Sequence, residues 1–424
     1  MNKIVIKNIG PIKDASIDLK RINIFIGPQS SGKSTIAKLI SFCTWLEKDI
    51  ILSTNINTYE NVEVFRSKLV DYHKIKGYFN VDSYLSYESD TIKFIYQKNS
   101  TKFDWVDKYS YEKSKIFYIP SERNIVILPE LQQYNFPNNS IRDFLFDWLD
   151  ARDQYVLSNS INILKPHLNY YYNKISSENH IKYEDDIHSY DILLSNASSG
   201  LQSLVPLVVV IEYAFNLINS VTKQTSFDKK GAFSKKMSDM FRDNVENYYK
   251  LKGIKFSNGE INNQIINDLN QKNDGFMQMM QNYASIYVKM LLITSIQVII
   301  EEPEQNLFPG TQKDVMYYLL TKVNNYSKKH RLTITTHSPY ILYALNNCML
   351  GYLVKNKLSK PSKSDKLVSN FYNSFINPQE VAVWSLKDGS ASIIQDEDGL
   401  IGKNYFDDCM ANVMDDYYRL INFF

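Results

Sequence analysis

Residues 27–34 form the feature that most constrains what this chain can fold into. They match the pattern G-x-x-x-x-G-K-[ST] in full, and the match consists of Gly27, Pro28, Gln29, Ser30, Ser31, Gly32, Lys33 and Ser34. A short apolar run, 22–26, precedes the match, and a helical pattern follows it. A strand that ends in such a turn and opens a helix directs backbone N–H groups and the positive end of the helix dipole at one point. That arrangement suits a polyphosphate.

The loop predicts a site for ATP or GTP together with Mg²⁺. Lys33 would reach the terminal phosphates, and the Ser34 hydroxyl would coordinate Mg²⁺. Thr35, which begins the helical pattern, belongs to the same predicted nucleotide-binding set. The motif alone does not separate ATP from GTP.

The composition excludes several classes of protein. The chain has 424 residues, enough for two or three domain-sized cores, and its net charge of +2 predicts neither strong attraction to nucleic acid nor strong repulsion. Its three cysteines are scattered, which fits a reducing cytosol and no disulfide framework. The most apolar stretch, 201–215, is shorter than the roughly 20 residues that cross a bilayer. We therefore expect a cytoplasmic protein with no membrane partner.

The hydrophobic pattern divides the chain into three predicted parts. These are an N-terminal lobe with the phosphate loop (1–127), a helical lobe with insertions (128–290) and a C-terminal lobe (291–424). Strands are expected at 3–7, 15–19, 22–26, 91–96, 116–119, 297–300, 333–336, 352–354, 381–386 and 391–394. Helices are expected at 36–46, 140–174, 201–219, 263–270 and 277–290.

Three carboxylates follow the predicted strand 297–300. Phosphoryl transfer needs one acid that holds Mg²⁺ and a second group that orients or deprotonates the attacking water. Consecutive acids at a strand end can supply both, because that end lies beside the phosphate loop in an α/β sheet. We assign Glu301 to Mg²⁺ and Glu302 to the water, and we expect Glu304 to make a loop or dimer contact.

A histidine follows the next predicted strand, within the segment Thr-His-Ser-Pro at 336–339. His337 could donate a hydrogen bond to the γ-phosphate or to the attacking water, and it need not be the base. Its place after a second buried strand favours a functional role over a structural one.

Together these motifs resemble those of ABC-type ATPases of the SMC, RecF and OLD-like AAA group. In that group a strand–Gly-Pro-Ile–strand entry (here 10–12) precedes the phosphate loop, and a Glu-Glu-Pro-Glu-x-x-Leu-x-Pro segment (301–309) precedes Thr-His-Ser-Pro. The resemblance implies an α/β P-loop NTPase fold of the ABC or SMC-head type. Such a fold has a mixed sheet core, an N-terminal antiparallel β subdomain and helical lobe insertions. It also implies ATP hydrolysis with Mg²⁺, and it favours ATP over GTP.

Two further segments match the group only through this resemblance. Residues 197–202 look like its ABC signature, in which Ser198, Ser199, Gly200 and Gln202 would contact the ATP bound by the other subunit. Without the resemblance, such a turn before a helix is equally an ordinary helix cap. Residues 118–123 resemble a segment between the two lobes, where Arg123 would sense nucleotide, cross the dimer interface or make a surface ion pair.

The chain also departs from the group at three places. Glu301 stands where most ABC proteins have Asp, although OLD-like relatives share the Glu. Phe308 stands where many relatives have His, and the signature lacks the usual double glycine. These departures alter details of the expected site and leave its plan intact.

Missing segments narrow the expected function. The sequence has no long heptad run like that of SMC repair ATPases, and the acidic segment 396–399 after His337 is predicted to be a turn rather than a Toprim metal site. The chain therefore resembles stand-alone ATPases of bacterial anti-phage and toxin–antitoxin-like systems, PtuA-like or AriA-like. There a neighbouring gene supplies the effector.

That resemblance implies an ATP-linked homodimer or higher homo-oligomer and a separate effector, a nuclease or toxin, that binds at 128–190 or 222–285. The alternative is a RecF- or SMC-like DNA-binding repair ATPase. The basic loop 355–366 is its only support. A third possibility, the nucleotide-binding subunit of a transporter, fits the SMC-like motifs less well.

Overall fold

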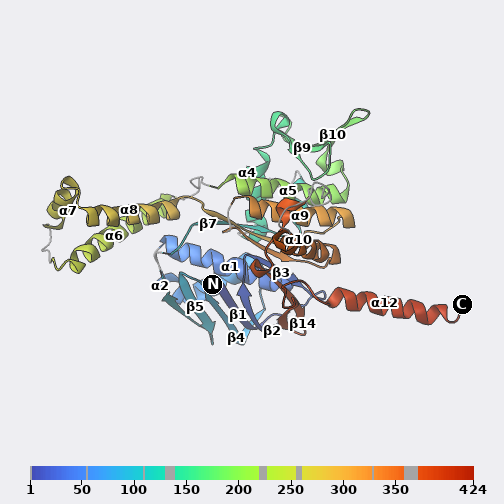
Figure 1. The fold of residues 1–424 in the computed structure, drawn as a ribbon, viewed down its shortest axis with the longest axis horizontal. Helices are drawn as coiled ribbons and strands as arrows, with labels where there is room; N and C mark the ends of the chain where they lie inside the picture. Colours follow the sequence, from blue (N-terminus) through green and yellow to red (C-terminus); the bar gives the residue numbers. More distant parts are fainter. Residues whose placement is uncertain are drawn as a thin grey trace.

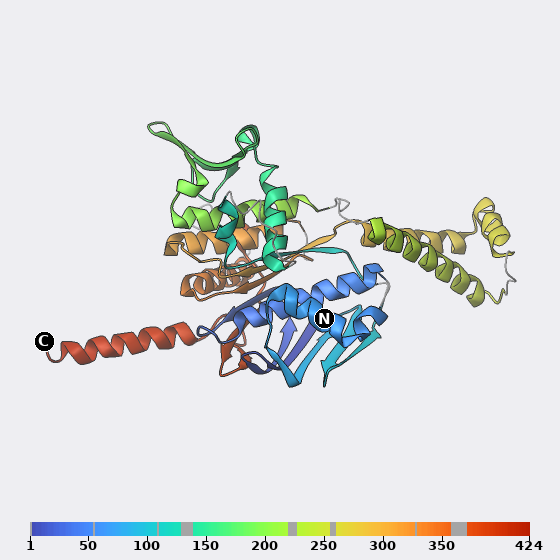
Figure 2. The same ribbon diagram turned by 180° about the vertical axis from the view of Figure 1, so that it is seen from behind.

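The computed structural model describes residues 2–53, 56–107, 110–128, 139–218, 227–254, 260–326, 329–357 and 371–424. Within them the chain forms a large sheet with helices on both faces and a smaller sheet beside it. Two helical arms extend from the body in opposite directions (Figures 1 and 2).

The large sheet has eleven strands in the order β6-β5-β4-β1-β2-β15-β14-β3-β13-β12-β7. They are β1 (Asn2–Ile9), β2 (Ile12–Leu19), β3 (Ile22–Ile26), β4 (Phe79–Glu88), β5 (Ile92–Gln97), β6 (Ser100–Trp105), β7 (Ser114–Ile119), β12 (Ser295–Glu301), β13 (Arg331–Thr335), β14 (Val381–Lys387) and β15 (Ser390–Ile393). The strands β14, β3, β13, β12 and β7 run parallel, whereas β2, β1, β4, β5 and β6 pair antiparallel. This mixed sheet with an N-terminal antiparallel part is the expected fold class, which is confirmed.

The central strand β3 separates two hydrophobic cores. All five of its residues are buried. Ile24 packs into the core that also holds α5 (Ser199–Asn216), α9 (Pro309–Tyr326) and α10 (Pro339–Lys357), whereas Phe25 packs against α1 (Lys33–Ser53) on the other face. Strands buried on both faces lack a polar alternation, which explains the continuous apolar run in the sequence.

Strands from the first and third predicted parts of the chain interleave in this one sheet, since β13 and β14 flank β3. The phosphate loop therefore lies at the junction of segments more than 300 residues apart, which parallel pairing brings together. The boundaries of the three parts stay a prediction.

The helix α5 is the predicted core helix. Among the described residues only α5 is long and apolar enough to cross a membrane, and 61% of that stretch is buried inside the protein. Its apolar residues are accounted for by packing against α4 (Ser140–Arg152) and the sheet (Figure 1).

The expected helix over 140–174 is wrong beyond Arg152. The chain there enters a four-stranded sheet in the order β11-β10-β9-β8. These strands are β8 (Ile161–Asn162), β9 (Leu168–Asn173), β10 (Glu178–Glu184) and β11 (Ser189–Leu193). Leu168, Tyr170 and Tyr172 pack into the large core, whereas Tyr171, which is also buried, stacks on His180. Alternate residues of β9 thus take different partners, as in a strand.

The expected strand at 352–354 is also wrong, because these residues belong to the last turns of α10. A run of three apolar residues is too short to separate a strand from a buried helix segment. The basic loop that was expected from Lys355 onward lies outside the described residues beyond 357.

Two further groups of helices complete the chain. The helices α2 (Asn57–Glu60) and α3 (Val62–His73) cover the antiparallel strands. One arm consists of α6 (Phe227–Leu251), α7 (Glu260–Asn270) and α8 (Asp274–Leu291), and the other is α12 (Tyr405–Ile421) alone (Figure 1).

Candidate functional site

The phosphate loop joins β3 to α1, and two glycines permit its shape. Gly27 and Gly32 have φ angles of +147° and +103°, which side chains disfavour. A Cβ atom on Gly27 would lie 2.4 Å from the carbonyl oxygen of Leu386, and one on Gly32 would lie 2.3 Å from Ile12 Cδ1. The loop is therefore held tightly against β14 and β2, and its conformation depends on glycine at both places.

Lys33 is held at the centre of this loop. Its ammonium group donates hydrogen bonds to the carbonyl oxygens of Gly27 at 2.8 Å and Pro28 at 2.7 Å, and the residue is buried. Burial lowers the pKa of Lys33 to about 8, whereas the nearby carboxylates of Glu302 and Glu304 act in the opposite direction. A partly desolvated cation at the centre of such a loop is suited to bind phosphate oxygens.

Ser34 and Glu301 meet between the loop and the end of β12. The buried carboxylate of Glu301 accepts hydrogen bonds from the Ser34 hydroxyl and the Tyr118 hydroxyl, while burial raises its pKa. Hydroxyl and carboxylate oxygens are the hard ligands that Mg²⁺ prefers. The two residues assigned to Mg²⁺ from the sequence are thus brought together, and their chemistry fits that ion.

Glu302, the residue that follows Glu301 in the chain, faces His337. Glu302 has a φ of +46°, and its N–H donates to the carbonyl of Thr335 at 2.8 Å, which links the ends of β12 and β13. Its Oε1 lies 3.6 Å from His337 Nε2, and both side chains are 35% exposed. Burial lowers the pKa of His337, as does Lys33, which favours the neutral imidazole. The structure thus places the predicted base and the predicted γ-phosphate ligand side by side at the open side of the site.

Glu304 fixes the histidine segment. Its Oε1 accepts a hydrogen bond of 2.6 Å from the His337 N–H, and it also accepts one from the Thr336 side chain. The carboxylate is buried, and burial raises its pKa. Glu304 thus makes the loop contact, one of the two contacts that the sequence left open, and it positions the backbone of His337.

Arg123 lies inside the protein with no exposed surface. Its guanidinium donates to the backbone carbonyls of Glu301 at 3.0 Å, Glu302 at 2.9 Å and Ser203 at 3.1 Å. The surface ion pair that the sequence left open is therefore not what the structure shows. The guanidinium instead fixes the turn that aims the two carboxylates. A direct contact of Arg123 with nucleotide or with a second subunit stays a prediction.

The signature segment caps α5. The Ser198 hydroxyl accepts a hydrogen bond of 3.4 Å from the Leu201 N–H, and the Gln202 side chain donates to the carbonyl of Ser195 at 2.8 Å. A Cβ on Gly200 would lie 3.0 Å from the carbonyl oxygen of Asn306, so the helix start packs against the turn after Glu304. In the described part of the chain, none of the hydrogen bonds of 198–202 reaches residues 27–35.

Two residues near the site were not assigned from the sequence. Tyr118 donates to Glu301, and Gln312 accepts a hydrogen bond of 2.5 Å from the Ser338 hydroxyl that caps α10. Tyr118 opens the segment 118–123, so its place beside the acidic strand end could have been suspected. Nothing in the sequence around Gln312 indicates its contact, because α9 and the start of α10 meet only in the folded chain.

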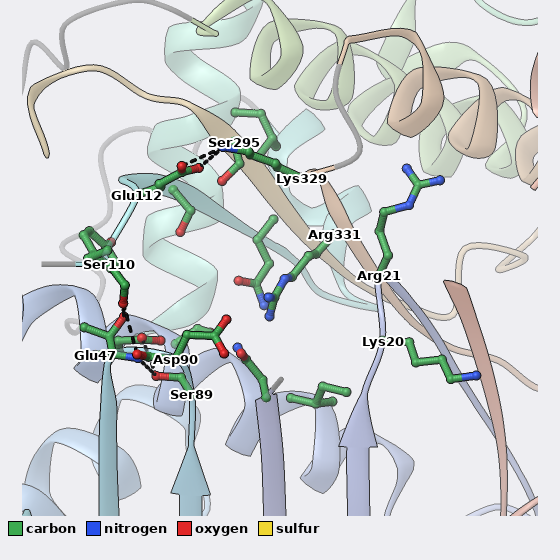
Figure 3. Close-up of a pocket in the computed structure, with 18 residues that line it drawn as sticks. Lys20, Arg21, Glu47, Ser89, Asp90, Ser110, Glu112, Ser295, Lys329 and Arg331 are labelled. Atoms are coloured by element: carbon green, nitrogen blue, oxygen red, sulfur yellow. Dashed lines mark hydrogen bonds and ion pairs between the residues drawn. The ribbon is translucent and has the colours of Figure 1, made fainter. Parts of the chain in front are cut away.

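A separate cavity of about 490 Å³ lies at the other edge of the sheet (Figure 3). It includes Ser295 and Arg331, which begin β12 and β13, whereas Glu301 and Thr335 end these strands. The cavity is therefore separated from the phosphate loop by the length of the parallel strands. It does not belong to the nucleotide site.

No protein-family model matches the chain, and no curated protein matches its sequence. Among solved structures, an SMC head bound to the C-terminal winged-helix domain of ScpA is 10% identical, covering 92% of this chain and 96% of that chain with a TM-score of 0.39. An SMC head from Thermotoga maritima is 11% identical, covering 93% and 98% with a TM-score of 0.35. The recombination mediator RecF of the RecFOR pathway is 11% identical, covering 92% and 97% with a TM-score of 0.29. These likenesses concern the fold alone.

Proposed function

We propose that this chain binds ATP with Mg²⁺ at the phosphate loop and hydrolyses it to ADP and phosphate. The observation that carries the proposal is the convergence of five predicted residues from three segments: Lys33, Ser34, Glu301, Glu302 and His337. Two hydrogen-bond networks hold this set, one through Arg123 and one through Glu304. If these charged residues only stabilised the fold as ion pairs, they would not need a loop held by glycines, a desolvated lysine and two strand ends at the same place.

Each of these residues has a separate role in the proposed hydrolysis of ATP. Lys33 and the loop N–H groups bind the phosphates, and Ser34 with Glu301 would hold Mg²⁺, which neutralises charge on the phosphate oxygens. Glu302 orients the attacking water and accepts its proton as the bond to phosphorus forms and the bond to the ADP oxygen breaks. His337 donates a hydrogen bond to the transferred phosphoryl group.

The signature segment supports a dimer closed around ATP. Ser198, Ser199 and Gly200 begin α5 with free N–H groups, and they make no hydrogen bond to the phosphate loop of their own chain. A second copy would place its signature over the γ-phosphate, since helix N-termini bind anions well. The site would then be complete only in a homodimer.

Hydrolysis and dimer formation can be tested together with Glu302→Gln. The variant should bind ATP·Mg²⁺, hydrolyse it at least roughly a hundredfold more slowly, and accumulate in the closed state, which an ATP-dependent cross-link between the phosphate loop and the signature of a second copy detects. Lys33→Ala should fail to bind nucleotide and show no ATP-dependent cross-link. Normal turnover by Glu302→Gln would disprove the assignment of the base.

We further propose that this ATPase is the sensor or regulatory subunit of a bacterial anti-phage system and controls a separately encoded effector. Support comes from the resemblance of its motifs to stand-alone defence ATPases and from the inserted segments outside the ATPase body. The test is co-purification of the Glu302→Gln protein with the products of adjacent genes, with and without ATP. Association that ignores ATP, together with unchanged phage resistance in Glu302→Gln cells, would refute this role.

The DNA-binding alternative gives a different result in the same preparation. A RecF-like repair ATPase should bind duplex DNA when ATP is present, with an affinity that falls steeply as salt rises. An ATPase rate and a gel mobility that ignore DNA would remove this alternative.

A further inference from the structure

The C-terminal helix α12 leaves the body of the protein and extends away from it (Figures 1 and 2). Its first turn is anchored, because Asn404 and Asp407 form a capping box and the Tyr343 hydroxyl donates to Asp407 at 2.6 Å. Beyond this turn the helix has no buried residue. Phe406 in the first turn packs partly against the core of its own protomer, and the rest of the 17 residues contribute almost nothing to it.

The exposed helix is nevertheless amphipathic. Apolar residues recur at alternating spacings of four and three, and this α12 seam consists of Phe406, Met410, Val413, Tyr417 and Leu420. The spacing is that of the a and d positions of a heptad, so the five side chains lie in one line along the helix. Met410 and Val413 are 64% exposed, and Leu420 is 72% exposed.

A helix of this composition is not expected to persist alone in water. Isolated helices of about 12–15 residues are marginal even when they are rich in alanine, and α12 contains aspartates, asparagine, valine and several aromatic residues. A continuous exposed apolar strip of this kind marks an interaction surface. The seam therefore requires a partner helix or groove.

We propose that the α12 seam binds the α12 seam of a second copy of this chain, side by side and in parallel, without nucleotide. The aspartates of α12 support this pairing. In a parallel pair the positions that flank the seam bring Cys409 beside the partner's Met414, and Asp416 beside the partner's Ile421, so no two carboxylates meet. An antiparallel pair that keeps the apolar residues of the two seams in contact would place Asp416 of one copy beside Asp416 of the other. The two like charges would repel each other.

The area is sufficient for a specific contact. An aromatic side chain buries about 150–250 Å². The seam offers Tyr417, Met410, Val413, Leu420 and the part of Phe406 that its own core leaves exposed. Pairing would then cover on the order of 600 Å² per copy, which is the lower end of the range for specific interfaces. This contact differs from the ATP-closed dimer, because it involves neither the phosphate loop nor the signature segment.

A cysteine cross-link tests the pairing and its direction. In a parallel pair Val413 faces its own copy, so Val413→Cys in a Cys409→Ser background should form a disulfide-linked dimer under mild oxidation without nucleotide. Asp415→Cys in the same background lies on the outer face and should stay monomeric. Equal linking of both variants, or none for Val413→Cys, would overturn the proposal.

A mass measurement without nucleotide gives the strength of the contact. Tyr417→Asp should weaken the dimer on the order of a hundredfold, because a charge enters the centre of the seam, whereas Asp415→Asn should leave it unchanged. Both variants should keep the melting temperature of the isolated protomer, since neither side chain is buried. A wild-type chain that is monomeric without nucleotide, including one that uses α12 to bind another protein, would overturn the proposal.

Lys33→Ala should retain α12 pairing while it loses ATP-dependent closure, which separates the two dimer contacts.

Discussion

The two edges of the parallel sheet are built from the same strands, yet their polar residues are arranged differently. At the carboxyl edge, Glu301, Glu304 and Arg123 are buried. The Glu301 carboxylate accepts from two hydroxyl groups, whereas Glu304 and Arg123 bond to backbone groups of neighbouring segments. At the amino edge, Arg331 projects into a polar cavity and Lys329 makes a half-exposed ion pair with Glu112 (Figure 3). Glu47, at the wall of this cavity, is the buried exception, and it accepts from the Tyr87 and Ser89 hydroxyls.

The difference shows at which edge the positions of polar side chains are fixed most firmly. Buried polar groups are costly unless every partner is present, so a network of them is kept where positions matter. Ion pairs that face water contribute little to stability and can be exchanged freely. Substitutions that are matched in chemistry but placed at opposite edges should therefore have unequal effects.

The largest difference is expected for two carboxylates. Glu302→Gln should lower the kcat for ATP by a factor of roughly 10² to 10⁴, because the water loses its proton acceptor. Glu112→Gln, at the opposite edge, should leave kcat unchanged. Phosphate release assays on both proteins check this, and equal losses would mean that Glu302 acts through the fold.

Two arginines give the next largest contrast. Arg123→Met should lower the free energy of unfolding by about 3 kcal/mol or more, since several buried carbonyl groups lose their donor. Arg331→Met should lower it by only about 1 kcal/mol, because its guanidinium faces a cavity open to water and acts on the buried Glu47 carboxylate through its charge alone. Urea denaturation measures both values. Similar values for the two variants would contradict the proposed difference between the edges.

A buried histidine behind the carboxyl edge predicts a pH dependence. His73 packs against the ring of Tyr118, and burial lowers its pKa to about 3. The unfolded chain binds a proton there below its ordinary pKa near 6.5, so stability should fall as the pH drops from about 6.5 toward 3. The loss at pH 4 is on the order of 3 kcal/mol.

His73→Phe should remove this part of the acid sensitivity, and the exposed His188→Gln serves as the control. Stability measured between pH 7 and pH 4 decides the matter. An unchanged slope in His73→Phe would show that carboxylates alone cause the acid loss.

The smallest effect is expected for Lys329→Ala. The ion pair with Glu112 is 57% exposed on the lysine side, so its removal should change the free energy of unfolding by less than about 0.5 kcal/mol. Thermal melts of this variant, with Asp415→Asn as a neutral surface reference, provide the measurement. A loss above about 1 kcal/mol would show that the amino edge is also a tightly coupled network.

The sequence predicted which segments meet at the carboxyl edge, because strands, glycines and acids leave local patterns there. The loop 27–34, the strand before Glu301 and the strand before His337 could each be found without the fold, and parallel pairing then brings them together. The role of Arg123 could not be found, because its partners are backbone carbonyls that carry no sequence signal. The β9 strand was mistaken for helix because it has only six residues and three of them in a row are buried, which leaves no alternating pattern to read.

The central claim, that each ATP site is completed by a second copy, is tested most directly by mixing two inactive variants. Lys33→Ala lacks a working phosphate loop and Ser199→Arg lacks a working signature, so each alone should hydrolyse almost no ATP. Mixed dimers contain one intact composite site, and an equal mixture should recover about a quarter of wild-type activity. A mixture that stays inactive, or a Ser199→Arg protein that is fully active alone, would contradict the claim.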